Sequence, residues 1–353
     1  MKALAALLPA VQLLALTACV ATPPQTAPAA APAPAPAPAE HADTLSYAEA
    51  LLRVGMRQRF DDSVAVANGR SILMSHGERA PRVYVLLHGF TDAPTQFATV
   101  GAHLFADGAN VYIPRLPHHA ERTAPLRAIG RVTSEELARF ADSTAQIARG
   151  LGDTIVVVGL SAGGVLAAWI AEYHPEVRRT VLIAPAIAMG RVSSDEGAGI
   201  VILASKLPEV VRMTAPIDTA RPENVPGIST RGLAELLRLG QRVRDRAGSD
   251  PPSVHDVVFL LNEADHTVSE EAALEVAHRW MDRGALPRAY RFTVGAKLPH
   301  NVMELTSHGG NTELVYPIVE SLARGGAAEG PEIVELLGAP CDGFWCRLRR
   351  RVP

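Results

Sequence analysis

Residues 154–167 constrain the fold of this chain more than any other stretch. They open with Ile155–Val158, an uninterrupted run of β-branched residues that is typical of a strand buried on both faces. Gly-Leu-Ser-Ala-Gly follows, and the Ala-rich apolar segment after it favours a helix packed against a sheet. A sharp turn between such elements holds Ser161 in a strained conformation with its hydroxyl exposed, while glycines leave room for neighbouring backbone. The stretch predicts that Ser161 is a nucleophile; the alternative is a glycine-rich turn with an incidental serine.

A nucleophilic serine needs a base, and the base needs a group that orients it. Asp265 is the candidate for the orienting group, because it lies in a loop beyond the carboxyl end of the predicted strand Val257–Leu261. Glu263 lies in the same loop and is the alternative carboxylate, whereas Asp256 lies at the opposite end of that strand. The sequence therefore favours Asp265 as the acid.

The base is expected to be a histidine, because a neutral imidazole accepts a proton near neutral pH. His300 lies on a loop after the predicted strand Tyr290–Val294 and precedes a helix-like segment. His308 is the alternative, but it lies beyond that segment. We therefore predict His300 as the base.

Attack on a carbonyl also requires two N–H donors for the oxygen that becomes negatively charged. The N–H of Ala162, directly after the serine, is one candidate. The second should come from the loop after an early strand, Val83–Leu87, where Phe90 follows Gly89. His88 precedes this glycine, and its position indicates a structural rather than a catalytic role for its ring.

Two adjacent histidines, His118 and His119, could suggest a metal site. Adjacent ring nitrogens without further ligands at suitable spacing are a poor ligand set, so we predict no metal. The net charge of −3 gives no reason to expect nucleic acid as a partner.

The globular part, residues 41–340, alternates apolar strand-like runs with helical segments, which predicts a mostly parallel sheet with helices on both faces. The predicted strands are Ser71–Met74, Val83–Leu87, Val111–Ile113, Ile155–Val158, Thr180–Ile183, Val257–Leu261 and Tyr290–Val294. The predicted helices are Ser46–Phe60, Thr95–Ala106, Ser134–Gly150, Ala162–His174, Ser269–Arg283 and Glu313–Ala323. The apolar face of the first helix, expected to pack on the domain, comprises Ala48, Leu51, Leu52, Met56 and Phe60.

Residues 190–249 interrupt this alternation. They contain no convincing strand and two helix-like segments, near Gly199–Val211 and Thr230–Arg246, joined by a Pro-rich loop. An insertion at this point of an open α/β sheet can lie above the carboxyl ends of the strands, where ligands bind. We therefore expect a helical cap; the alternative is a surface excursion without substrate contact.

Residues 1–19 look like a bacterial lipoprotein signal peptide, with a positive start and a short apolar run that ends Leu-Thr-Ala-Cys. We expect Cys19 to be lipidated; an ordinary cleaved signal peptide is the alternative. Residues 20–40 form an Ala/Pro-rich linker that favours extended polyproline II. Because Val20 rather than an aspartate follows the cysteine, we expect a lipid-anchored protein of the outer membrane that faces the periplasm.

Residues 341–353 form a basic tail in which Cys341 and Cys346 flank a turn-forming Asp-Gly pair. Export from the cytoplasm permits a disulfide between these cysteines, although spacing alone does not establish the geometry. The arginine cluster over Arg347–Arg351 is expected to be solvated, with contact to an anionic membrane surface as the alternative.

Four motifs, LLHGF, GLSAGG, NEADHTV and LPHNVM, occur in this order and resemble those of a bacterial carboxylesterase or monoglyceride lipase of the α/β-hydrolase superfamily. The resemblance covers about residues 82–319. It implies the α/β-hydrolase fold, a serine-hydrolase mechanism without a cofactor, and a cap over an apolar acyl pocket. The residues that fall on the family's triad and oxyanion positions are Ser161, Asp265, His300, Phe90 and Ala162.

One segment departs from the family's pattern: His118, His119 and Ala120 stand where the family often has Gly-His-Gly, which leaves the local loop and the pocket edge open. These features together predict a membrane-tethered hydrolase of small-molecule carboxylic esters with short or medium acyl chains, or of the monoacylglycerol type. The alternatives are an acyltransferase, thioesterase or peptidase with the same triad, or a non-catalytic envelope lipoprotein.

Overall fold

The computed structural model describes residues 45–190, 210–213, 221–225, 227–305 and 309–338. The signal peptide, the linker and the basic tail lie outside these ranges. Cys19, His308, Cys341 and Cys346 lie outside them too, so the roles expected for these residues stay predictions. Among the helices within the described ranges, none has both the length and the apolar character that a membrane span requires.

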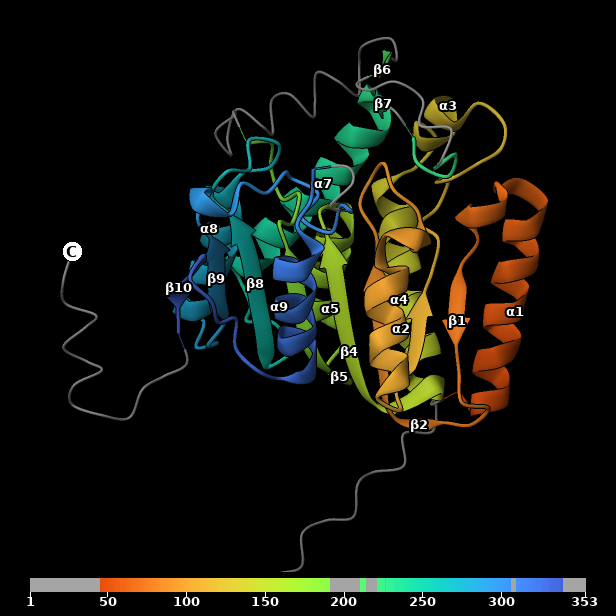
Figure 1. The fold of residues 1–353 in the computed structure, drawn as a ribbon, viewed down its shortest axis with the longest axis horizontal. Helices are drawn as coiled ribbons and strands as arrows, with labels where there is room; N and C mark the ends of the chain where they lie inside the picture. The colour runs from red at the N-terminus through yellow and green to blue at the C-terminus, as the bar shows by residue number, and fades with distance from the viewer. Residues whose placement is uncertain (1–44, 191–209, 214–220, 226, 306–308, 339–353) are drawn as a thin grey trace, which may run out of the picture. The chain divides into compact units, whose positions relative to one another are not determined.

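An eight-stranded sheet forms the centre of the domain (Figure 1). In spatial order its strands are β1 (Ile72–Met74), β3 (Asn110–Ile113), β2 (Ala80–Leu87), β4 (Gly152–Leu160), β5 (Val177–Ile183), β8 (Asp256–Asn262), β9 (Arg288–Phe292) and β10 (Ile333–Leu337). All neighbours from β3 to β9 pair parallel, whereas β1 and β10 pair antiparallel at the two edges. The loops after β4, β8 and β9 therefore gather at one edge of the sheet, where ligands bind in folds of this kind.

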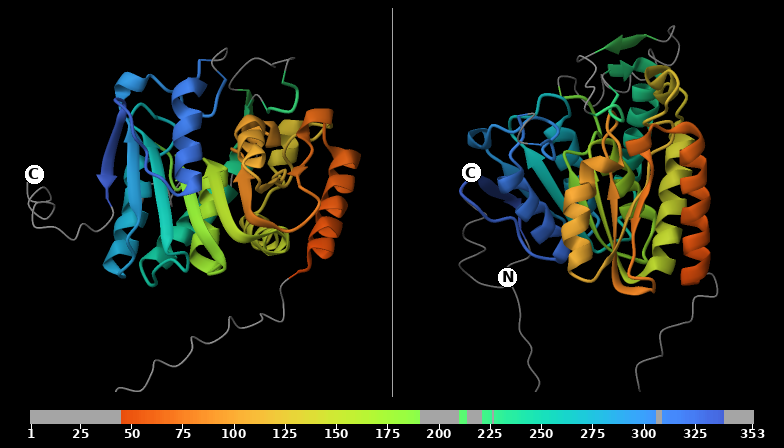
Figure 2. Two further views of the ribbon diagram at one scale, coloured as in Figure 1. Left: turned by 60° about the horizontal axis from the view of Figure 1, so that its bottom comes forward. Right: turned by 45° about the vertical axis from the view of Figure 1, so that its right-hand side comes forward.

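Helices cover both faces of the sheet (Figures 1 and 2). On one face lie α2 (Ala98–Ala106) and α9 (Thr312–Arg324). On the other, α4 (Ser134–Leu151), α5 (Ala162–Tyr173) and α7 (Thr230–Ala247) pack against one another. α8 (Glu270–Asp282) contacts α7 and β8, and α1 (Tyr47–Val64) packs on α4. The predicted α/β-hydrolase architecture, a mostly parallel sheet with helices on both faces, is confirmed.

Three short strands and one short α-helix were not predicted. Inside the insertion, β6 (Val211–Met213) and β7 (Gly227–Ser229) pair antiparallel, so the expectation of no strand there is wrong, as is the helical assignment of Val211. β10 is a partly exposed edge strand defined by its pairing with β9. α3 (Pro125–Ile129) is a single short turn of helix. Elements this short depend on their partners rather than on an apolar period of their own. Except for its end, the predicted helix near Gly199–Val211 lies outside the described residues.

α1 forms where a helix is predicted, but it turns a different face to the domain. Ala50 is buried against α4, where a Cβ on Gly150 would lie only 2.6 Å from the Ala50 Cβ. Asp61 is also buried, because its carboxylate binds groups inside the domain. The expected packing face is therefore wrong in part, since Leu52, Met56 and Phe60 are 57–60% exposed.

Candidate active site

Ser161 lies at the turn between β4 and α5, with φ 55° and ψ −110°. Residues other than glycine rarely adopt such a positive φ, and the surrounding structure must hold them there. The Ser161 N–H donates to the Ile183 carbonyl at 2.9 Å. A Cβ at Gly163 would lie 2.0 Å from the Leu87 carbonyl oxygen, so only glycine lets α5 begin this close to β2. The local sequence thus folds into the strained turn expected for an exposed nucleophile.

The side chains of Ser161, His300 and Asp265 form a continuous hydrogen-bonded chain. Ser161 Oγ lies 2.9 Å from His300 Nε2, and His300 Nδ1 lies 2.6 Å from Asp265 Oδ2. A proton on Nδ1 leaves Nε2 free to accept the hydroxyl proton. The other carboxylate oxygen, Asp265 Oδ1, accepts the N–H groups of Thr267 at 2.7 Å and Val268 at 3.2 Å. These amides fix the carboxylate toward the imidazole, so the structure brings the three predicted residues together.

The alternative carboxylates are engaged elsewhere. Glu263 accepts the Val294 N–H at 3.1 Å and lies 3.4 Å from Arg291, away from the histidine ring. Asp256 forms an ion pair with Arg179 at the opposite end of β8. Both are parts of structural ion pairs.

Asn262 is a positioning residue that the sequence reasoning did not identify. Its side-chain amide donates to the carbonyls of Leu298 at 3.1 Å and Pro299 at 3.0 Å. These bonds tie the loop that carries His300 to the end of β8. The signal available in the sequence was an asparagine directly after the apolar run of a predicted strand.

Phe90 and Ala162 are the predicted N–H donors. Among the hydrogen bonds of the described residues, none uses the N–H of either residue. His88, which is fully buried, bonds the Gly89 carbonyl through Nδ1 at 2.9 Å, while its Nε2 accepts the Leu116 N–H at 3.1 Å. Burial holds the pKa of His88 well below its ordinary value, so the neutral ring can accept at Nε2. Because the Gly89 carbonyl and the Phe90 N–H belong to one planar peptide, His88 fixes the direction of this donor.

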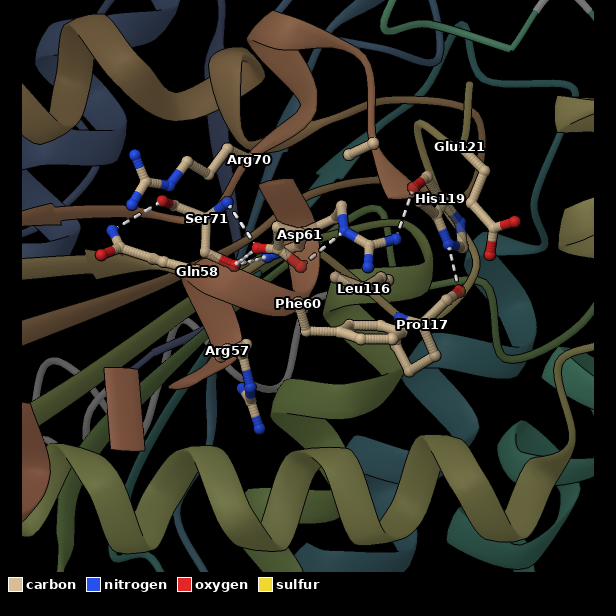
Figure 3. Close-up of polar contacts among 12 residues, drawn as sticks. Arg57, Gln58, Phe60, Asp61, Arg70, Ser71, Leu116, Pro117, His119 and Glu121 are labelled. Atoms are coloured by element: carbon tan, nitrogen blue, oxygen red, sulfur yellow. Dashed lines mark hydrogen bonds and ion pairs between the residues drawn. The ribbon is translucent and has the colours of Figure 1, made fainter. Parts of the chain in front are cut away.

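A buried ion pair connects α1 to the loop after β3. The side chains of Asp61 and Arg115 are 1% and 3% exposed, and Arg115 Nε donates to Asp61 Oδ1 at 2.8 Å. Asp61 Oδ2 accepts the N–H and the hydroxyl of Ser71 at 2.9 and 2.6 Å. Arg115 in turn donates to the His119 carbonyl at 2.7 Å (Figure 3). The His119 ring packs edge-on against Phe90, with 5.4 Å between ring centroids, so His119 connects the ion pair to the predicted oxyanion donor.

The segment that departs from the family's Gly-His-Gly pattern keeps a glycine-like backbone. His118 and Ala120 have φ values of 63° and 52°, in the left-handed region that favours glycine. His118 contacts Glu121 and Glu136 at 3.0 and 3.3 Å. Burial lowers the pKa of His119 to about 4, and its Nδ1 bonds a backbone carbonyl. Within the described ranges, no group of three or more potential metal ligands occurs.

A cavity of about 510 Å³ opens onto Ser161 and His300. Its apolar lining includes Leu160, Ala186, Met189, Val225, Ile228, Leu233, Leu236 and Val268. Its polar lining includes Asp92, Arg221, Asn224, Asn301 and Glu304. Several of these residues belong to the insertion, so its described part contributes directly to the cavity wall.

A profile of the Alpha/beta hydrolase family matches residues 84–338, and the chain belongs to this family. The fold, the serine turn and the family match therefore agree on one class of protein, the α/β-hydrolases. α1 and β1 lie outside the matched residues.

Among individual proteins, the chain is similar to a thermostable monoacylglycerol lipase from Bacillus sp. (strain H-257), with 31% identity over 132 residues. The match covers 34% of this chain and 49% of that lipase, so the chain spans about half the length of its relative. The structure of the metagenome-derived lipolytic enzymes LipS and LipT has a TM-score of 0.57 at 16% identity and covers 74% of this chain and 99% of that one. The monoacylglycerol lipase of Paleococcus ferrophilus has a TM-score of 0.54 at 18% identity, covering 72% and 98%. These two structures share the fold.

Proposed function

We propose that this protein hydrolyses carboxylic esters through an acyl-enzyme formed on Ser161. The observation that carries the proposal is the hydrogen-bonded chain from Ser161 through His300 to Asp265, with distances of 2.9 and 2.6 Å. Ser161 and His300 line the cavity, so a substrate carbonyl can reach the serine hydroxyl. Membership in a hydrolase family supports the same reaction class.

The first half-reaction forms the acyl-enzyme. His300 Nε2 removes the proton from Ser161 as Oγ attacks the acyl carbon, and Asp265 stabilises the resulting imidazolium. The N–H groups of Phe90 and Ala162 bind the carbonyl oxygen, which carries the negative charge of the tetrahedral intermediate. The bond between the acyl carbon and the alcohol oxygen then breaks, and the alcohol leaves with the proton from His300.

The second half-reaction releases the acid. Water gives a proton to His300 as its oxygen attacks the acyl carbon. The intermediate collapses, the ester bond to Ser161 breaks, and Ser161 Oγ regains the proton. The net reaction consumes one ester and one water and yields one alcohol and one carboxylic acid.

The proposed substrates are esters of short or medium acyl chains, including monoacylglycerols. The apolar part of the cavity suits an acyl chain, because burial of each CH₂ contributes about 0.8 kcal/mol. The similarity to a protein named monoacylglycerol lipase supports this choice of substrates.

A fluorophosphonate probe and a panel of esters of graded chain length test the proposal. We expect the wild type to label and to turn over esters, and Ser161→Ala to do neither. Added alcohol, thiol and amine acceptors, with analysis of the products, separate hydrolysis from acyl transfer, while thioester and peptide substrates test the other reactions. A folded wild type that neither labels nor cleaves any ester contradicts the proposal and favours a non-catalytic role.

We also propose that Cys19 carries lipid and anchors the domain in the bacterial envelope. The motif that ends at Cys19 and the linker over residues 20–40 support this arrangement. An extended linker of about 20 residues at ~3.1 Å per residue reaches about 60 Å from the membrane. Such a tether would let the domain reach esters in a nearby bilayer.

A further inference from the structure

One carboxylate of the cavity wall, that of Asp92, takes no part in the triad and has no partner among the described residues. Asp92 lies two residues after Phe90 in the same loop, and the whole residue is 8% exposed. Its N–H donates to the Gly89 carbonyl at 3.3 Å, but its carboxylate makes no hydrogen bond or ion pair with any described residue. Because Asp92 lines the cavity, its carboxylate is accessible to a molecule bound there. A bound ligand with a hydrogen-bond donor would give this carboxylate a partner.

Of the charges near Asp92, Arg221 and Glu304 pair with each other, and Glu223 is a further buried carboxylate. Arg221 lies 2.7 Å from Glu304, which also accepts the Asn301 amide at 3.0 Å. Asn301 accepts in turn from Gln96 at 3.0 Å. Burial and the nearby Glu304 raise the pKa of Asp92 to about 7, against the opposing charges of Arg221 and His300. The Asp92 carboxyl is therefore not neutralised by a cation of the protein, and in either protonation state it can accept a hydrogen bond from a hydroxyl.

The position of this carboxyl in the reaction follows from the role of His300. The alcohol oxygen must receive its proton from His300 Nε2, so the alcohol part of the ester lies beside that ring. Asn301 and Glu304 follow His300 on the same loop, and Asp92 lines the same cavity. The acyl chain then lies against the apolar part of the cavity wall, which Met189 and the insertion form.

We propose that Asp92 forms a hydroxyl-binding subsite that selects esters whose alcohol carries a further hydroxyl group, as in a glycerol monoester. The subsite rests on the proposed esterase function and adds the specificity of its leaving group. The hydroxyl donates to the Asp92 carboxylate, while Arg221 and Glu304 are engaged with each other.

The test compares kcat/KM on three esters that share an octanoyl chain: 1-monooctanoylglycerol, propyl octanoate and octanoylcholine. We expect Asp92→Leu to lower the ratio of the glycerol ester to the propyl ester by about 10- to 100-fold, as loss of a hydrogen bond to a charged group predicts. Asp92→Asn keeps an acceptor of the same shape and should retain most of the ratio. Leu233→Ala, on the apolar wall, should leave the ratio unchanged and shift the preference among acyl chain lengths.

Fluorophosphonate labelling of every variant reports the fold and the triad independently of the alcohol. If Asp92→Leu labels normally and the ratio is that of the wild type, the subsite is wrong while the esterase proposal stands. If octanoylcholine is the preferred ester and loses most in Asp92→Leu, Asp92 binds a cation and the hydroxyl assignment is overturned. If the folded wild type cleaves no ester, the proposed function fails and the subsite with it.

Discussion

Replacement of Asp61 would show how much α1 contributes to the stability of the loop after β3. In Asp61→Leu the Arg115 guanidinium still donates to the His119 carbonyl, but it loses the carboxylate that balances its charge. The N–H and the hydroxyl of Ser71 lose their acceptor. The side chains of the pair are 1% and 3% exposed, so water cannot replace the lost carboxylate. Removal of one partner of a buried pair costs about 3–5 kcal/mol, and we expect a loss in this range from the free energy of unfolding.

Urea unfolding followed by circular dichroism measures this loss, and a second ion pair that begins from α1 provides the control. Asp62 lies 3.2 Å from Arg70, with side chains 53% and 46% exposed, so Asp62→Leu should cost less than about 1 kcal/mol. The double variant Asp61→Leu/Arg115→Met replaces the buried pair by apolar side chains and should recover most of the lost stability. Since it also removes the bond to the His119 carbonyl, we expect kcat to stay below the wild-type value while KM changes less.

Two results would refute the reasoning. If Asp61→Leu unfolds at the same urea concentration as Asp62→Leu, the buried pair does not stabilise the domain as argued. If the double variant regains both the stability and the kcat of the wild type, the network has a structural role only and does not position the oxyanion loop.

Three further predictions concern the triad, a buried acid and the anchor. Ser161→Ala and His300→Ala should each remove most ester turnover, by up to about a millionfold as in another serine hydrolase, and the double variant should be little worse; near-normal activity of His300→Ala would reject this residue as the base. Burial and the nearby Asp250 raise the pKa of Glu172 to about 9, so the folded state holds an extra proton and loses stability as the pH rises from about 4.5 to 9. Glu172→Gln should therefore raise the Tm more at pH 8.5 than at pH 5, and an equal effect at both would contradict the assignment. Cys19→Ser should release the protein from the membrane fraction without loss of purified-domain activity, whereas unchanged fractionation would reject the anchor.

The central strand, the serine turn and the mostly parallel character of the sheet could be predicted because their signals are local. A buried parallel strand is apolar without interruption, and a glycine-flanked serine between strand and helix permits few other conformations. Asp265 and His300 could be placed because each follows a strand at its carboxyl end, and parallel strands bring such loops together. The insertion helix α7 was also predicted almost to its ends, because its amphipathic period is long.

The parts that could not be predicted depend on contacts between distant segments. Asp61 and Arg115 are 54 residues apart, and nothing in either local pattern marks them as partners. Their pairing, together with the close contact of Ala50 on α4, decides which face of α1 is buried and overrides its apolar stripe. Nothing in the sequence around Asp92 indicates that its carboxylate lines the cavity without a partner among the described residues, because distant segments form the cavity wall.

At position 161, a side chain that the proposed reaction requires lowers the stability of the fold. A serine held at a positive φ carries a conformational cost of about 1–3 kcal/mol, which glycine would avoid. Selection for a stable fold alone would therefore favour glycine at this turn, and only selection for the hydroxyl retains a side chain there. Suppose that a related protein has glycine at position 161 and keeps β4 and α5 otherwise intact. We expect such a protein to have lost the reaction while it keeps the fold.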